Sequence, residues 1–218
     1  MKADLHIHSN FSNDGKSTVE EIIEAAVEKG LGCIAITDHN SFEAYGLAKD
    51  NGKVIVIPGI EVSSKEGHIL AYGIDRDIPR GMTIKETIDA IHEAGGVAFA
   101  AHPYRWWSGL GEENVLCSDF DGVEAKNGRS TSSGNKKAGA LAARVGKPVS
   151  AGSDAHTPPC IGEGIVELPD DISTWQDALN AVMEGKAKPS SKNRGVGSTV
   201  KYGTKSIVEW IFRGFKKM

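Results

Sequence analysis

Histidines in this sequence gather at the borders of apolar segments that have the composition of β-strands. Six of the seven histidines lie at such borders: His6, His8, His39, His68, His102 and His156. Two carboxylates, Glu61 and Asp154, stand in the same kind of position. Histidine is a common metal ligand, and it is the side chain that titrates near neutral pH. If the segments are strands of one barrel, their ends meet at one rim, where these eight side chains would form a single site.

Spacing within the segments indicates which side chains face the same way. Residues two apart on a strand share a face, so His6 and His8 can reach one metal together, with Asp4 one step deeper. We expect Asp4 to orient a histidine ring. Asp154 and His156 repeat this spacing towards the other end of the chain. A single His-x-His pair arises by chance in many chains, so the recurrence of such pairs carries the prediction.

Two further segments add to the proposed site. Adjacent residues on a strand point to opposite faces, so only one member of the pair Asp38-His39 can be a ligand. We expect His39 to be the ligand and Asp38 to brace the site. Glu61 follows an apolar run, where a carboxylate either begins a solvated loop or bridges two cations. Imidazoles on neighbouring strands favour the bridge.

Strand-like and helix-like segments alternate along the chain. The predicted strands are 3–8, 31–39, 53–64, 68–75, 97–103, 120–128, 147–156 and 163–171, and the predicted helices are 19–30, 41–52, 83–96, 132–146 and 173–185. This alternation predicts parallel βαβ units in an α/β fold. We count about seven such units, one short of the eight of a TIM-type barrel. The barrel is expected to span residues 1–188.

Residues 189–218 differ in composition from the rest of the chain. They contain seven basic residues and one acid, Glu209, and residues 206–215 read as a short amphipathic helix. We expect this basic C-terminal tail to be an appendage on the barrel. It could bind nucleic acid or an anionic surface, although a solvated end is the simpler interpretation.

Overall composition is that of an ordinary single domain. The 218 residues include 39% hydrophobic and 25% charged residues, with a net charge of −4, so global charge gives no argument for nucleic acid. The first residues are too polar for a signal peptide, and no apolar run approaches the roughly 18 residues of a spanning helix. Three widely separated cysteines suggest no disulfide framework. We expect a cytoplasmic protein without a membrane span and leave its oligomeric state open.

Several segments together resemble the polymerase and histidinol phosphatase (PHP) family. They are DLHIHSNFSNDG, ITDHN, GIEVS, HILAYG, AHPYR, VEAKNG and GSDAH, in the order of that family, over residues 3–168. The resemblance implies a distorted (β/α)7 TIM-like barrel that holds two or three divalent metal ions at its C-terminal rim. It also implies that these metals assist hydrolysis of phosphate esters.

The resemblance also implies a set of metal ligands. The first ion would take His6, His8, Glu61 and Asp154; the second would share Glu61 and add His68 and His102; the third would take Asp14, His39 and His156. Some family members have histidine where this chain has Asp14. An oxygen ligand there favours Mn²⁺ or Fe²⁺ over Zn²⁺ at that position. Glu124 matches a family acid after the fifth strand, with a less certain role as a ligand.

The expected chemistry is transfer of a phosphoryl group to water. Metal ions can bind phosphate oxygens and lower the pKa of a water towards neutrality, so that a metal-activated hydroxide attacks the ester. Glu61 and Asp154 would be essential as ligands. Arg105 and Arg129 follow strand ends, where a guanidinium suits phosphate; each is as readily explained as a surface salt bridge.

The predicted function is that of a metal-dependent phosphoesterase, either phosphatase or phosphodiesterase. Its substrate would be a small phosphorylated metabolite or nucleotide, with phosphate as product. A DNA or RNA nuclease is the first alternative, with an oligonucleotide as substrate. The pair Trp106-Trp107 could stack on a base or ring substrate, although such a pair more often covers a loop. A non-catalytic metal-binding module and an amidohydrolase are the others. The intact ligand set argues against the module, and the lack of a bridging lysine argues against the amidohydrolase.

Overall fold

The computed structural model describes residues 1–191. In this range the helices are α1 (Val19–Glu28), α2 (Glu43–Ala48), α3 (Ile84–Glu93), α4 (Glu112–Leu116), α5 (Ser132–Val145) and α6 (Trp175–Met183), with a 3₁₀ turn η1 (Pro158–Cys160). The strands are β1 (Lys2–Ile7), β2 (Cys33–Ile36), β3 (Ile55–Ile57), β4 (Gly59–Ser63), β5 (His68–Tyr72), β6 (Val97–Ala100), β7 (Gly122–Asn127), β8 (Val149–Gly152), β9 (Gly164–Glu167) and β10 (Lys188–Ser191).

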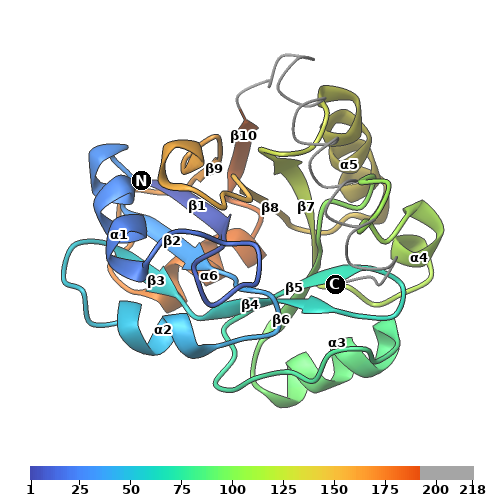
Figure 1. The fold of residues 1–218 in the computed structure, drawn as a ribbon. Coiled ribbons are helices and arrows are strands. Elements are labelled where there is room, and N and C mark those ends of the chain that lie inside the picture. The colour runs from blue at the N-terminus through green and yellow to red at the C-terminus, as the bar shows by residue number, and fades with distance from the viewer. Residues whose placement is uncertain (192–218) are drawn as a thin grey trace.

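These strands form two five-stranded sheets, so the fold is mixed α/β as predicted (Figure 1). The first sheet has the order β10-β9-β1-β2-β3 and the second the order β4-β5-β6-β7-β8. The expected closed barrel is not found in the described residues. Between the two sheets, backbone pairing is reduced to two isolated parallel bridges, Ile7 with Ala155 and His39 with Glu61.

The segment 53–64, predicted as one strand, is divided between the two sheets. Pro58 separates β3 from β4, and β3 pairs with β2 whereas β4 pairs with β5. Proline has no amide hydrogen for a strand ladder, which suits it to the point where the chain leaves one sheet for the other. A run of apolar residues alone could not predict this division.

Strand direction also differs from the all-parallel expectation. The pairs β1-β2, β2-β3, β6-β7 and β7-β8 are parallel, but β4-β5, β5-β6, β1-β9 and β9-β10 are antiparallel. Only the segment 64–67 joins β4 to β5. A parallel crossover needs a dozen or more residues, so this short connection makes a hairpin.

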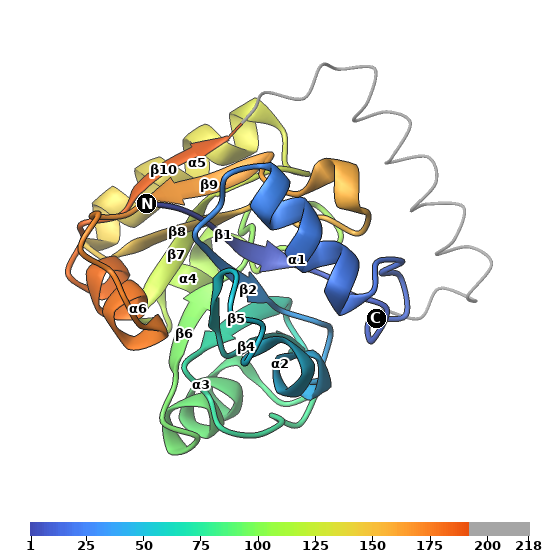
Figure 2. The same ribbon diagram turned by 90° about the vertical axis from the view of Figure 1, so that its left-hand side faces the viewer.

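The helices begin where the sequence signals predicted. Thr18, Thr83 and Thr174 each cap a helix in a capping box, and α1 and α2 pack on the first sheet while α3 and α5 pack on the second (Figures 1 and 2). Helix α4, within a stretch predicted to be irregular, has only five residues. None of the helices in residues 1–191 is long and apolar enough to cross a bilayer.

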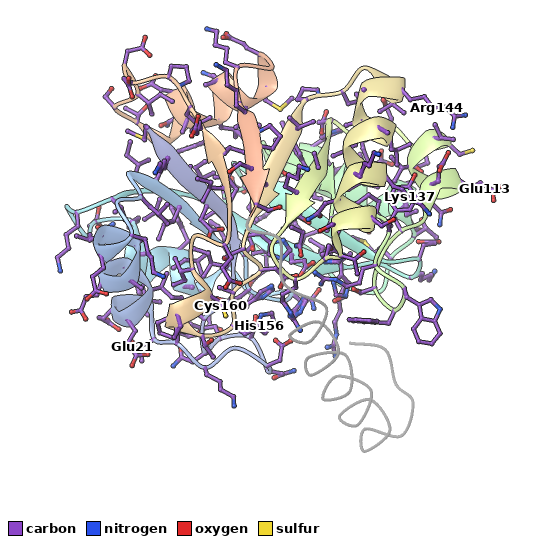
Figure 3. All side chains as sticks on the ribbon, turned by 90° about the horizontal axis from the view of Figure 1, so that it is seen from above. Glu21, Glu113, Lys137, Arg144, His156 and Cys160 are labelled. Carbon is purple, nitrogen blue, oxygen red and sulfur yellow. The ribbon has the colours of Figure 1, made fainter. Side chains whose placement is uncertain are left out.

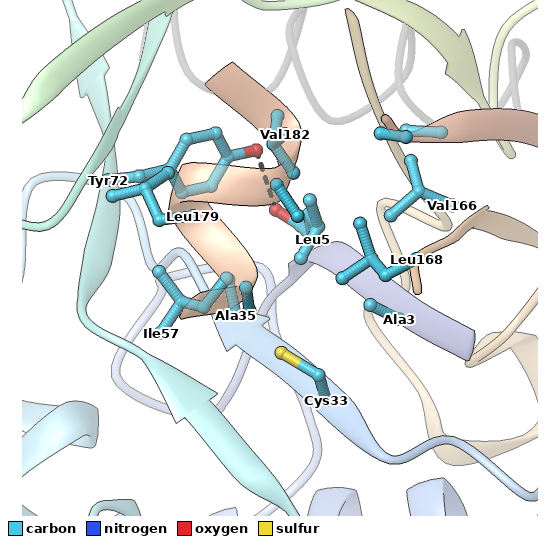
Figure 4. Close-up of a cluster of buried hydrophobic side chains, with 14 of the residues drawn as sticks. Ala3, Leu5, Cys33, Ala35, Ile57, Tyr72, Val166, Leu168, Leu179 and Val182 are labelled. Carbon is cyan, nitrogen blue, oxygen red and sulfur yellow. Dashed lines mark hydrogen bonds between the residues drawn. The ribbon is translucent and has the colours of Figure 1, made fainter. Parts of the chain in front are cut away.

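One core cluster joins the two sheets. It combines Leu5 and Cys33 of the first sheet with Tyr72 of the second and with Leu179 and Val182 of α6 (Figure 4). The buried Tyr72 hydroxyl donates to the Leu5 carbonyl at 2.8 Å, also drawn in Figure 4. These side-chain contacts hold the two sheets together in the region where no backbone hydrogen-bond ladder joins them.

The predicted boundary at residue 188 falls within β10. This strand pairs antiparallel with β9, so residues 189–191 of the predicted tail belong to the first sheet. The rest of that tail, including the predicted helix at 206–215, lies outside the described residues.

Candidate metal centre

The histidine and carboxylate side chains meet where the two sheets adjoin. His6 and His8 flank one partner of the bridge Ile7–Ala155, and Asp154 and His156 flank the other. The second bridge is itself formed by His39 and Glu61. The candidate ligands therefore come from both sides of the two junctions, and Figure 3 labels His156 just after β8.

The carboxylates of Glu61 and Asp154 both approach the ring nitrogens of His6 and His8, the side chains expected to hold the first ion. The two Nε2 atoms lie 3.1 Å apart. Oε2 of Glu61 is 3.4 Å from the His6 Nε2 and 3.3 Å from the His8 Nε2. Oδ1 of Asp154 lies 3.9 and 3.4 Å from the same two nitrogens. All four side chains are buried.

Glu61 presents its two carboxylate oxygens to different sets of imidazoles. Oε1 lies 3.0 Å from Nδ1 of His68 and 2.8 Å from Nε2 of His102. Oε2 faces His6 and His8 and also lies 3.2 Å from Nδ1 of His39. This geometry is the one that a carboxylate bridging two cations requires.

His68 shows how strand direction assembles the site. It is the first residue of β5, whereas most other candidate ligands follow the ends of strands. Because β5 runs antiparallel to β4 and β6, its beginning lies at the edge where β6 ends. His68, at the start of its strand, therefore lies at the same edge of the sheet as His102, which follows the end of β6.

A third group of side chains lies beside the first. Oδ2 of Asp14 is 2.8 Å from Nε2 of His156 and 3.9 Å from Nε2 of His39. His8 has a ring nitrogen within reach of the same group. The Asp14 loop is held by backbone hydrogen bonds, including Lys16 N–H to the His156 carbonyl at 3.1 Å. All nine predicted ligands therefore occur in groups whose donor atoms lie close enough to hold a metal ion. The groups differ from the predicted sets: they are His8, Asp14, His39 and His156; His6, His102 and Asp154; His6, His8 and Glu61; and His39, Glu61 and His68.

Glu124 orients His6 from behind. Its Oε1 lies 2.8 Å from Nδ1 of His6, and its Oε2 accepts from the backbone N–H of His102 at 2.7 Å. The carboxylate thus selects the tautomer of His6 that carries the proton on Nδ1, leaving Nε2 free to face Glu61. Glu124 contacts candidate ligands and belongs to none of the grouped sets in the described residues.

Asp4 does not orient a histidine ring, contrary to our expectation. Its carboxylate accepts backbone N–H groups from His6 at 3.3 Å, Ser153 at 2.8 Å and Gly162 at 2.8 Å. Asp4 therefore joins β1 to the segments around β8 and β9. The alternation of residues along the strand could not show that backbone N–H groups, and not a histidine ring, would bind the Asp4 carboxylate.

Asp38 braces the site as predicted, through serine hydroxyls. It accepts from Ser9 Oγ at 2.6 Å and Ser12 Oγ at 2.8 Å. Since the Ser12 proton points to Asp38, the Ser12 oxygen accepts from Nδ1 of His8 at 3.1 Å and from the backbone N–H of His39 at 2.8 Å. This relay also leaves Nε2 of His8 free for a metal.

The cluster is strongly polarised. Burial lowers the pKa of His8, but hydrogen bonds to Asp154 and Glu61 raise it to about 9. Burial raises the pKa of Glu61, yet His68, His6 and His39 bring it well below its ordinary value. Burial and the charge of Arg105 lower the pKa of His102 to about 4. The Glu61 carboxylate therefore stays ionised, as ligation of cations requires.

Unpartnered buried atoms support a fit to metal ions. In the described residues, Asp14 Oδ1 and His102 Nδ1 are buried without a hydrogen-bond partner, and His39 Nδ1 forms no hydrogen bond although Glu61 Oε2 lies 3.2 Å away. Buried polar atoms are otherwise nearly always bonded. A mixed imidazole and carboxylate donor set suits Mn²⁺, Fe²⁺ or Zn²⁺. The residues present therefore fit a centre of divalent cations.

Backbone strain is concentrated at the same place. Among residues 1–191, the non-glycine residues with positive φ are Asn40 (56°), His102 (28°) and Asp154 (53°). Two are candidate ligands and the third follows His39. Such conformations cost roughly 1–3 kcal/mol each and persist where the surroundings impose them, commonly at functional sites.

Two arginines point into the centre, and both contact Asp154. Arg105 Nη2 donates to Asp154 Oδ2 at 2.5 Å and to Asn127 Oδ1 at 2.6 Å, and Arg129 Nη1 donates to Asp154 Oδ1 at 3.3 Å. Their side chains are only 8% and 18% exposed, so these are not surface salt bridges. Trp106, by contrast, is 86% exposed.

Asn127 is a site residue that sequence reasoning missed. Besides receiving Arg105, it donates from Nδ2 to Glu124 Oε1 at 3.0 Å and to Asp154 Oδ2 at 3.2 Å. Asn127 is the last residue of β7. This position at the end of a strand was the feature of the sequence that could have identified it as a site residue. A polar residue closing a buried strand should have been grouped with the other strand-end side chains.

Matches to known proteins agree with this arrangement. Residues 4–125 match the model of the PHP domain, and residues 132–187 match a PHP-associated model. An uncharacterized protein of Methanocaldococcus jannaschii is 40% identical over 141 residues, covering 58% of this chain and 82% of its own length. A two-domain protein of Bacteroides vulgatus, described as containing a predicted PHP-like metal-dependent phosphoesterase, has the same fold. Its TM-score is 0.73 at 19% identity, over 88% of this chain and 64% of that one.

Relatives named for an activity share shorter regions. A phosphoribosyl 1,2-cyclic phosphate 1,2-diphosphodiesterase of Eggerthella lenta is 35% identical over 36% of this chain and 33% of its own. A 5′-3′ exoribonuclease of Salmonella typhimurium is 33% identical over 42% of this chain and 39% of its own. The chain thus spans well under half the length of these two relatives.

Fold and site together define an enzyme of the class that hydrolyses phosphoric esters, to which these named relatives also belong. The chain belongs to the PHP domain family. The family match covers more than half of the sequence and includes every candidate ligand up to His102, and the PHP-associated match includes Asp154 and His156.

Proposed function

We propose that this protein is a metal-dependent phosphoesterase that hydrolyses a phosphate ester of a small metabolite or nucleotide. The observation that carries the proposal is the placement of Glu61 between two sets of imidazoles, with two arginines directed at the neighbouring Asp154. A centre that only held a cation would have no need of buried guanidinium groups beside it.

The proposed ligand sets are those expected from the family resemblance. The first ion would be held by His6, His8, Glu61 and Asp154, the second by Glu61, His68 and His102, and the third by Asp14, His39 and His156. All of these residues belong to the groups that lie close enough to hold an ion, although those groups divide them differently. Mn²⁺, Fe²⁺ and Zn²⁺ all suit these donors. Bound cations supply Lewis-acid stabilisation of phosphate charge and lower the pKa of a coordinated water.

The chain's own residues would bind and orient the ester. Arg105 and Arg129 present N–H groups to the same carboxylate, Asp154, from two segments. Once cations share the charge of Asp154, these N–H groups can donate to phosphate oxygens, for which a guanidinium has the matching geometry. Glu124 and Ser12 would keep the His6 and His8 rings in place throughout.

A nuclease is the second candidate function. Similarity to the Salmonella typhimurium exoribonuclease favours it, as does the exposed Trp106 next to Arg105, on which a base could stack. The non-catalytic module and the amidohydrolase are less well supported, because neither accounts for the two arginines. A cytoplasmic location stays a prediction.

The test compares Glu61→Gln with a matched control, Glu113→Gln on α4, whose carboxylate is exposed. Figure 3 shows Glu113 at the outer edge of the molecule, far from His156. Metal content is measured by elemental analysis after Mn²⁺ reconstitution, and turnover by phosphate release from a panel of phosphomonoesters and diesters. We expect Glu61→Gln to lose at least one ion and at least 100-fold in turnover while remaining folded. Wild-type protein that binds less than one ion per chain would overturn the proposal.

A further inference from the structure

A cavity of about 430 Å³ opens beside the candidate metal centre. It is lined by His39, Asn40, Asn13 and the segment 77–80, so His39 belongs both to the cavity wall and to the proposed ligand set. A volume of this size is at the lower end of the range for small-molecule sites. A phosphate ester reacting at the centre would therefore have room for its non-reacting part in this cavity.

The wall next to His39 is rigid. Asn40 adopts a left-handed backbone conformation with φ of 56°, and its side chain both accepts from the Ser63 N–H at 2.8 Å and donates to Ser63 Oγ at 3.1 Å. The Asn40 backbone N–H donates to the Glu61 carbonyl at 3.0 Å. Asn40 thus connects this part of the cavity lining directly to Glu61, the residue that faces both sets of imidazoles.

The segment 77–80 of the cavity lining is anchored at several points. Ile78 is buried in the core cluster beneath the second sheet. Gly81 donates its backbone N–H to the Ser63 carbonyl at 2.7 Å, and Asp77 accepts from the Phe42 N–H at 2.7 Å. The exposed Arg80 therefore follows directly on an anchored backbone segment.

Arg80 is the cation of this cavity. Within the described residues it has no ion pair, whereas Arg76, four residues earlier, binds Asp75 at 2.9 Å and the Glu93 carbonyl at 2.7 Å. Asp77 is the acid of the lining, and its Oδ1 is engaged by Phe42. A guanidinium without a carboxylate partner, on a fixed wall beside a phosphoesterase centre, is suited to an anionic group.

We propose that this cavity binds the non-reacting part of the substrate and that Arg80 recognises a second phosphate group on it. The inference rests on the proposed phosphoesterase function and narrows its substrate to esters with two phosphates. Such a second phosphate can belong to a bisphosphorylated small molecule or to the next nucleotide of an oligonucleotide. Asn13 and Asn40 add polar groups to the lining, where they suit the part of the substrate that joins the two phosphates.

The experiment pairs substrates that differ by one phosphate. Fructose 6-phosphate is compared with fructose 1,6-bisphosphate, and thymidine 5′-phosphate with a 5′-phosphorylated thymidine dinucleotide, in wild type, Arg80→Ala, Arg80→Lys and the control Arg76→Ala. We expect Arg80→Ala to raise KM for the two-phosphate member of the preferred pair at least tenfold more than for its one-phosphate partner. Arg80→Lys should restore part of the difference, and Arg76→Ala should behave as wild type.

A second readout does not depend on turnover. Dissociation constants for each pair are measured by calorimetry on metal-free protein, and the preference for two phosphates should disappear in Arg80→Ala. If Arg80→Ala changes the dissociation constants of both members of each pair equally, or changes neither, Arg80 does not recognise a second phosphate. Absence of hydrolysis of every ester by metal-loaded wild type would instead overturn the proposed function, and the calorimetric preference would still report on Arg80. The pair that shows the effect identifies the source of the second phosphate.

Discussion

Oε1 of Glu124 lies 2.8 Å from Nδ1 of His6, and both side chains are fully buried. The two residues are 118 positions apart in sequence, on β7 and β1. This contact sets the orientation of the imidazole whose other nitrogen faces His8 and Glu61. It shows that the proposed centre depends on a layer of residues behind the ligands.

Glu124→Gln should therefore weaken metal binding without unfolding the protein. Loss of the charge behind His6 reduces the basicity of Nε2, and such partners typically contribute 10–100-fold to metal affinity. Competition with a chelator measures the change, and Glu113→Gln is the matched control. An unchanged affinity would mean that Glu124 has only a structural role.

Replacing Arg105 or Arg129 by alanine should lower kcat/KM at least tenfold and leave the metal content unchanged. Both guanidiniums contact Asp154, but cations can balance that carboxylate once bound. Elemental analysis and steady-state kinetics separate the two effects. Arg144→Ala is the control, since Arg144 forms an exposed pair with Glu112 and lies on α5 away from His156 in Figure 3. Loss of metal in Arg105→Ala would assign Arg105 to holding Asp154 in place.

Gly152→Ala should destabilise the protein and disturb the centre together. A Cβ at Gly152 would lie 2.2 Å from the Cβ of His6 and 2.5 Å from its backbone nitrogen, so β1 and β8 would have to separate. We expect the free energy of unfolding to fall by about 3 kcal/mol, the upper end of the cost of overpacking. Urea titration measures it.

Gly139→Ala is the control for this change. It lies within α5, where an added Cβ meets no atom within 4 Å. Alanine favours a helix interior over glycine by up to about 1 kcal/mol, so this variant should be slightly more stable than wild type. Similar stability of the two variants would show that β8 can move away from His6.

The stability of metal-free protein should fall as pH rises from about 6.5 to 9. The folded-state pKa of His8 is raised to about 9 from its ordinary 6.5, so its protonation stabilises the fold fully below pH 6.5. That contribution, at most about 3 kcal/mol, is lost as pH rises through the folded-state pKa. Urea titrations of wild type and His8→Gln in the presence of EDTA isolate it. If the difference between the two proteins does not change with pH, the His8 assignment is wrong.

Local patterns in the sequence determined which side chains would form the centre. Eight of the nine candidate ligands border an apolar segment, whereas Asp14 was expected only from the family resemblance. The two-residue spacing of His6 and His8 already placed them on one face. Strand geometry enforces that spacing whatever the rest of the fold does. The starts of α1 and α3 are set by the capping residues Thr18 and Thr83, whose hydrogen bonds are equally local.

Only the tertiary structure decided how these parts face one another. The division of the strands into two sheets at Pro58 and the antiparallel course of β5 depend on pairing between distant segments, which apolar composition does not encode. For the same reason sequence alone missed Asn127 and assigned the wrong donors to Asp4. The directions of the two Glu61 oxygens and the presence of Arg80 and His39 in the lining of one cavity also arise from contacts across the fold. Side-chain type is a property of each position, but the partners of a buried charge are set by whichever segments pack against it.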